Sequence, residues 1–189
     1  MQSEVEVLFN KIQNLLIKLI PENWKSIYLY ASVLKKRRGE MYFYYFPKKL
    51  IKTKAVNCYE IPDKFGFEEN SYNKNLELLY KLIKDLNRLM IPRWTNVTIS
   101  IENGIFTIEY CYNNIEESRY SDEERRIVWS VKNLGVSLES LNLKERTLVE
   151  IYNETSSIKP KKYSQKIIKT NIEGITSESQ EIKNKILKY

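Results

Sequence analysis

The chain has 189 residues, of which 42% are hydrophobic and 29% are charged, values typical of one globular domain with its own core. No apolar run approaches the roughly 20 residues of a membrane span, and no signal peptide is visible, so we expect a cytoplasmic protein without a membrane partner. The sequence holds no histidine and only two cysteines, which argues against an enzyme, a metal site, a cofactor or a small-molecule substrate, because the usual general base and transition-metal ligands are missing.

The net charge of +7 arises in one segment. Residues 34–54 hold eight basic residues and a single acid, Glu40, whereas the rest of the chain is balanced. Four of the cations follow one another in a turn, Lys35, Lys36, Arg37 and Arg38. This turn could grip phosphates while nearby tyrosines stack on bases. The alternative is a solvated hairpin tip that guards a sheet edge.

The N-terminal segment 3–20 is predicted to be an amphipathic helix. Ser3 and Glu6 form a capping box, apolar residues recur at helical spacing, and Pro21 ends the helix. Trp24 is expected in the connection that follows, where it closes one end of the core.

Strand patterns come next, at 26–33 and 41–46, joined by the basic turn. Gly39 in that turn is available for positive φ. Aromatic residues on both faces of the second run indicate a central strand. A third strand is predicted at 55–61, followed by a loop at 62–67.

A second helix is predicted at 71–90, before the strongest structural signal in the chain. Residues 94–112 alternate apolar and polar residues on both sides of Asn103-Gly104, the preferred pair for a type I′ hairpin turn. A two-residue turn fixes the register. It predicts three apolar pairs on one face, Ile101–Phe106, Ile99–Ile108 and Val97–Tyr110, and two polar pairs on the other, Ser100–Thr107 and Thr98–Glu109.

A third helix is predicted at 121–134, with a Ser121–Glu124 capping box and Gly135 as its stop. Its buried stripe is assigned to Ile127, Val131 and Leu134. Arg125, Trp129 and Lys132 then lie on the opposite face.

Further on, a helix is expected within 138–153, and from Thr155 a polar tail with a short helix after Ser177. The predicted order is α-β-β-β-α-β-β-α plus a C-terminal helical extension. This is an α+β fold: an antiparallel sheet of about five strands, with helices packed mainly on one face.

The acidic stretch before and within the third helix suggests a partner surface. The capping box and helix dipole account for the acids from Asp122 onward, and the spacing matches no calcium loop, so Glu116 and Glu117 are the acids free for a partner. Arg125, Trp129 and Lys132 extend this surface if Trp129 is an exposed hot spot. The alternative is that Trp129 packs under the C-terminal segment.

Several segments together resemble the YezG-like immunity proteins of Gram-positive bacteria. They are IPENW, the aromatic strand pair, IPDKFGF, LELLYKLIKDLN, PRWTNVTISIENGIFTIEYCY and ERRIVWSVKNLGV. The most specific is the closing pattern of Glu124-Arg125, Trp129, Lys132, Leu134 and Gly135. The resemblance covers residues 1–136 and leaves 137–189 as a C-terminal extension, partly helical or loosely ordered.

The resemblance implies an antitoxin, a cytoplasmic protein that binds and neutralises the toxic C-terminal domain, often a nuclease, of a toxin exported by the type VII secretion system. Stoichiometric occlusion is the expected mechanism. The partner-binding residues are then Glu116, Glu117, Arg125, Trp129 and Lys132, with the basic turn directed elsewhere. The rival hypothesis is a nucleic-acid-binding module that uses segment 34–54, and a third is an unrecognised enzyme.

Overall fold

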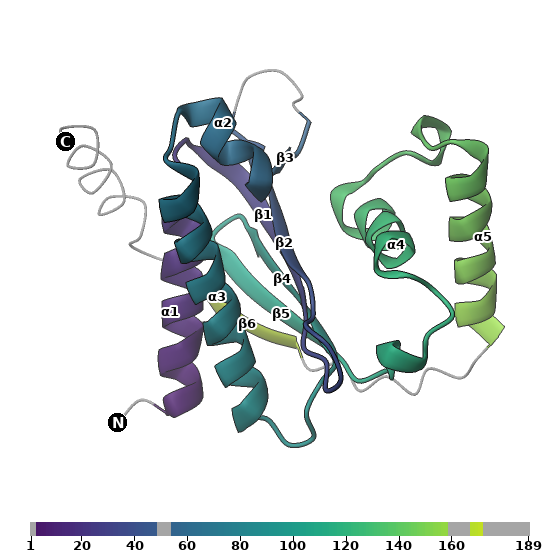
Figure 1. Ribbon diagram of the computed structural model, residues 1–189, viewed down its shortest axis with the longest axis horizontal. Helices are drawn as coiled ribbons and strands as arrows, with labels where there is room; N and C mark the ends of the chain where they lie inside the picture. Colours follow the sequence, from purple (N-terminus) through teal and green to yellow (C-terminus); the bar gives the residue numbers. More distant parts are fainter. Residues whose placement is uncertain (1–2, 49–53, 159–166, 172–189) are drawn as a thin grey trace.

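The computed structural model describes residues 3–48, 54–158 and 167–171, and their arrangement is layered (Figure 1). Two helices lie against one face of an antiparallel sheet, and a second pair of helices lies on the other side. The predicted α+β class and the order of the predicted elements are confirmed, with a short helix at 61–65 and a sixth strand in addition. The sheet has six strands in the order β3-β2-β1-β4-β5-β6, because the C-terminal strand β6 (Ile167–Asn171) pairs antiparallel with β5.

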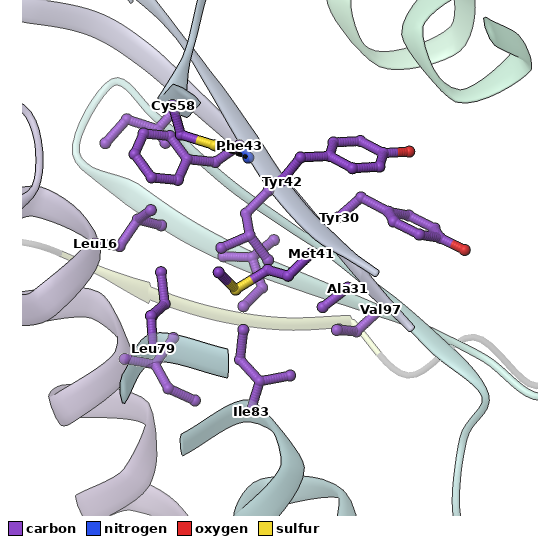
Figure 2. Packing of buried hydrophobic residues seen from close by; sticks show 14 of the residues in the cluster. Leu16, Tyr30, Ala31, Met41, Tyr42, Phe43, Cys58, Leu79, Ile83 and Val97 are labelled. Atoms are coloured by element: carbon purple, nitrogen blue, oxygen red, sulfur yellow. Dashed lines mark hydrogen bonds between the residues drawn. The ribbon is translucent and has the colours of Figure 1, made fainter. Parts of the chain in front are cut away.

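Helices α1 (Glu4–Lys18) and α3 (Glu69–Leu89) form the outer layer on the first face. The Ser3–Glu6 capping box is present, as predicted. Their apolar stripes meet the inward residues of the sheet in one buried core, part of which Figure 2 shows. Leu16, Leu79 and Ile83 come from the helices, and Ala31, Phe43 and Val97 from the strands, all fully buried.

The sheet is built from two hairpins. Strands β1 (Trp24–Ser32) and β2 (Met41–Pro47) form the first, and β4 (Asn96–Glu102) and β5 (Ile105–Cys111) the second. β1 pairs with β4 between them. Trp24 is therefore the first residue of a strand rather than part of a connection, since the chain becomes extended immediately after Asn23.

The segment after β2 departs from the prediction. Only β3 (Val56–Asn57) is a strand; it is followed by a 3-10 turn (Cys58–Glu60) and by α2 (Ile61–Phe65), where a loop was expected. The Asn57 side chain accepts from the Tyr59 N–H and so caps the turn. Proline is also tolerated in the first turn of a helix, and Gly66 ends α2 in the left-handed conformation.

The second hairpin has the predicted register at every pair from Val97–Tyr110 to Ile101–Phe106. Asn103 (φ 49°) and Gly104 (φ 74°) both take the positive φ of a type I′ turn. The residues preferred in the turn and the alternation of the side chains indicate the same register here, so the sequence alone was sufficient to predict it.

Replacing Gly104 with Val should lower the free energy of unfolding by about 1 to 3 kcal/mol, the cost of a strained backbone position. A Cβ at this position meets no atom within 4 Å, so the cost comes from the backbone alone. Gly104→Asn is the control, because Asn tolerates positive φ. Equal urea midpoints for the two variants would show that φ does not limit this position.

The remaining elements are a 3-10 turn (Ile115–Glu117), α4 (Asp122–Leu134), a second 3-10 turn (Leu138–Ser140) and α5 (Leu143–Ile158). The capping box and the Gly135 stop of α4 are confirmed. The helix expected within 138–153 starts later, because Asn142 and Glu145 exchange backbone-to-side-chain hydrogen bonds at its beginning. The short helix predicted after Ser177 lies outside the described residues. None of the described helices has the length and apolar character needed to cross a membrane.

Candidate partner-binding surface

Trp129 is buried against the sheet, contrary to the prediction that it faces away from the core. Its side chain is 8% exposed. Its ring lies 5.3 to 6.2 Å from those of Tyr30, Tyr42 and Tyr44, and its Nε1–H donates to the Thr98 hydroxyl at 3.0 Å. We call these five residues the Trp129 cluster. It joins α4 to the sheet face opposite α1 and α3.

The prediction of a buried stripe at Ile127, Val131 and Leu134 was wrong, because α4 is covered on two sides. Ile127 and Val131 are half-buried rather than fully buried, and they lie about 200° around the helix from Trp129 at 100° per residue. Helix α5 packs against α4 on the side away from the sheet (Figure 1). A single apolar stripe identifies the core-facing side only where a helix has one covered face.

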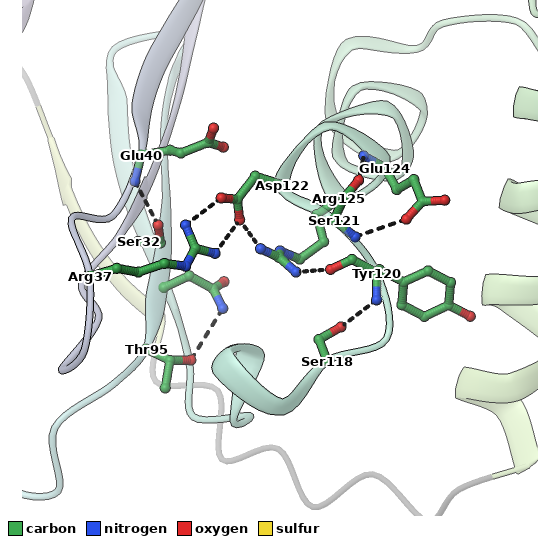
Figure 3. Close-up of polar contacts among 11 residues, drawn as sticks. Ser32, Arg37, Glu40, Thr95, Ser118, Tyr120, Ser121, Asp122, Glu124 and Arg125 are labelled. Carbon is green, nitrogen blue, oxygen red and sulfur yellow. Dashed lines mark hydrogen bonds and ion pairs between the residues drawn. The ribbon is translucent and has the colours of Figure 1, made fainter.

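The basic turn and the acidic segment, expected to point apart, are bonded to each other. Backbone N–H groups of Lys35 and Lys36 donate to Glu116 Oε1 at 3.0 and 2.8 Å. Arg37 makes a bidentate pair with Asp122 at 2.5 and 2.8 Å, and Arg125 also donates to Asp122 (Figure 3). The attraction between the two segments sets the position of the N-terminal end of α4.

The five predicted partner residues therefore separate into two groups. Glu116, Arg125 and Trp129 are used inside the fold, by the contacts above. Glu117 is exposed, and the Lys132 side chain is 66% exposed, with its Nζ 4.0 Å from Glu109 Oε2. The pattern predicted exposure because sequence spacing places residues on a helix face but does not reveal what that face meets.

A cavity of about 570 Å³ opens beside the basic turn, between α2, α3 and the first residues of β2. This volume lies within the range of ligand pockets. Among its lining residues are four acids, Glu40, Asp63, Glu69 and Glu77, and two cations, Arg38 and Arg126. Three tyrosines complete the walls: Tyr42, Tyr59 and Tyr80. Sequence reasoning missed this site because its residues come from five separate segments.

Two of the three cavity tyrosines donate hydrogen bonds to backbone carbonyls. The Tyr80 hydroxyl donates to the Ser32 carbonyl at 2.9 Å, and the Tyr59 hydroxyl donates to the Met41 carbonyl at 2.8 Å. Burial raises the pKa of Tyr59 to about 12 and raises that of Tyr42 as well. These phenols therefore stay neutral at physiological pH and act as hydrogen-bonding groups.

Arg126 approaches the same wall from α4. Its guanidinium carbon lies 4.6 Å from the Tyr42 ring centroid, and two of its nitrogens donate to the Tyr44 hydroxyl at 3.2 and 2.7 Å. Cys58, behind this wall, is fully buried. Burial raises the pKa of its thiol to about 12, so the thiol is protonated and not poised for nucleophilic chemistry.

Comparison with known proteins places this arrangement in a family. The family model described as "Immunity protein YezG-like" matches residues 5–148. The chain belongs to the YezG-like immunity protein family. The match runs from α1 into α5, so it includes the Trp129 cluster and every residue named above as lining the cavity.

Two curated relatives, each named immunity protein YezG, are similar to this YezG-like chain. One, from Bacillus spizizenii, is 31% identical over 135 residues, which cover 68% of this chain and 81% of that protein. The other, from Bacillus subtilis (strain 168), is 28% identical over 143 residues, which cover 73% of this chain and 93% of that protein. Strand β6 lies beyond the part of the chain that the family model matches.

Proposed function

We propose that this protein is an immunity protein, an antitoxin that binds a toxin and neutralises it by stoichiometric occlusion. The single observation that carries the proposal is the family match over residues 5–148. The finer parts of the proposal are that the partner is the C-terminal domain of a type VII secreted toxin and that this domain is a nuclease. They rest on the sequence resemblance and on the acidic excess of the cavity, which suits the cationic cleft of a nuclease.

Binding without catalysis is the mechanism that suits these residues. The described chain offers an open cavity with tyrosine and carboxylate walls, and its buried thiol is protonated. An inhibitor of this kind gains affinity from aromatic and charged contacts at the partner surface. Glu117 and Lys132, both exposed, remain candidates for additional contacts near α4.

Co-expression with the C-terminal domain of the toxin encoded beside this gene should restore growth and yield a 1:1 complex on size exclusion. The chain alone and an unrelated toxin domain are the controls. A toxin domain that stays lethal and elutes separately would refute the proposal. If the domain is a nuclease, adding one equivalent of the antitoxin should abolish DNA or RNA cleavage in vitro.

The alternative, nucleic-acid binding through segment 34–54, has less support from the contacts. Arg37 is paired with Asp122 and Arg38 with Glu77, so two of the four turn cations already have an acidic partner within the chain. Lys49 and Lys52 of the segment lie outside the described residues. If the protein bound nucleic acid, its affinity would fall with salt at a log-log slope of about −0.7 to −0.9 per phosphate contacted.

A further inference from the structure

The cavity beside the basic turn has a charge opposite to that of the chain. Its four acids exceed its two cations, although the chain as a whole carries +7. Asp63 and Glu69 are exposed at the cavity and make no ion pair with any residue in the described ranges. Unpaired carboxylates beside an open cavity attract cationic groups and repel phosphates.

Arg38 shows how a guanidinium lies at the rim of this cavity. It donates to Glu77, and its guanidinium carbon is 5.9 Å from the centroid of the Tyr80 ring. The side chains of this ion pair are 71% and 60% exposed. Exposed ion pairs of this kind contribute little to stability. A guanidinium from a partner can therefore replace that of Arg38 beside Glu77.

Tyr42 lines the cavity from the opposite face of the sheet. The residue is 3% exposed, and its ring projects away from the core (Figure 2). The Arg126 guanidinium carbon and the Trp129 ring lie 4.6 and 5.3 Å from the centroid of this ring, so it faces α4 and not α3. The Tyr80 ring and the Glu77 carboxylate are therefore the groups that match the donors and the planar cation of an arginine side chain.

We propose that this cavity receives an arginine side chain of the toxin domain. The inference rests on the proposed function, and it deepens that function by placing the contact at α2 and α3. Glu77 would pair with the guanidinium and Tyr80 would stack on it, in the place that Arg38 now takes, while Asp63 and Glu69 would attract it to the cavity. A nuclease domain has such arginines, because it must hold a phosphate backbone.

Calorimetric titration of the toxin domain into wild-type and variant proteins tests this assignment. Asp63→Asn with Glu69→Gln should weaken binding by about tenfold or more, as expected for charge pairs at an interface. Glu123→Gln with Glu139→Gln is the matched control, since it also removes two exposed acids, but outside the cavity. All four positions are exposed, so the variants should fold. Equal losses in the two variants would mean that only overall charge matters and would overturn the assignment.

Arg38→Ala tests the assignment by the direction in which the affinity for the toxin domain changes. Removing Arg38 frees Glu77 and leaves Lys84 as the remaining cation beside the Tyr80 ring, so a cationic group of the partner should bind several-fold more tightly. An anionic group would bind more weakly, because the cavity would lose a cation. Weaker binding of the toxin domain to Arg38→Ala would therefore refute the proposed arginine contact.

A small probe separates this inference from the proposed function. If the wild-type chain fails to bind the toxin domain, the immunity assignment fails, and the cavity is tested with a tri-arginine peptide followed by amide NMR. The peptide should shift the amides of Glu69 and Asn73, and the Asp63→Asn, Glu69→Gln variant should lose the shift. If inorganic phosphate shifts these amides and the peptide does not, the cavity binds anions and the inference is wrong.

Discussion

Trp129→Ala should lower the free energy of unfolding by about 3 to 5 kcal/mol, the usual cost of truncating a buried Trp. The substitution empties the space between α4 and the three tyrosines of the Trp129 cluster. It also leaves the Thr98 hydroxyl without the donor it now has. We expect the urea midpoint to fall and the near-ultraviolet circular dichroism of the aromatic cluster to change.

Two variants control this prediction. Trp129→Phe keeps an aromatic ring and loses the Nε1–H, so it should cost about 1 kcal/mol for the hydrogen bond plus a smaller packing loss. Lys132→Ala, on the same helix and largely exposed, should stay within about 0.5 kcal/mol of wild type. If Trp129→Ala weakened toxin binding while leaving stability unchanged, Trp129 would be the exposed hot spot suggested by the sequence pattern.

Gly39→Ala should destabilise the protein by about 3 kcal/mol, at the upper end of the cost of overpacking. A Cβ built at Gly39 lies 1.9 Å from the Ser32 carbonyl oxygen and 2.7 Å from the Tyr80 hydroxyl. The Tyr80 hydroxyl donates to that same carbonyl, and Ser32 and Glu40 are joined by two further hydrogen bonds. The extra methyl group therefore forces the end of β1 away from α3.

The role of Gly39 differs from the positive φ that the turn sequence suggested. Gly66, Gly104 and Gly135 take positive φ, whereas Gly39 does not. Gly39→Asn should consequently be as harmful as Gly39→Ala, although Gly104→Asn should be mild. Lys36→Ala, an exposed change in the same turn, should leave the thermal midpoint nearly unchanged. Full stability of Gly39→Ala would mean that the backbone approach at Ser32 is looser than described.

The sequence alone determined the features that depend on neighbouring residues. The Asn103-Gly104 turn fixed the register of β4 and β5, and the Ser3 and Ser121 capping boxes fixed where α1 and α4 begin. Local hydrogen bonds and side-chain alternation act within a few residues, so they can be read from a short window. The α+β class followed, because a sheet with one apolar face requires helices on that face.

Only the tertiary structure decided what each exposed-looking group meets. Trp129 is buried because the sheet has a second face lined with aromatic side chains. Glu116 accepts hydrogen bonds from backbone N–H groups of the turn some 80 residues earlier. The cavity joins Tyr42, Asp63 and Glu77 from separate elements. Charge pairing and ring packing between distant segments depend on how the helices pack on the sheet, and no local sequence pattern predicts that packing.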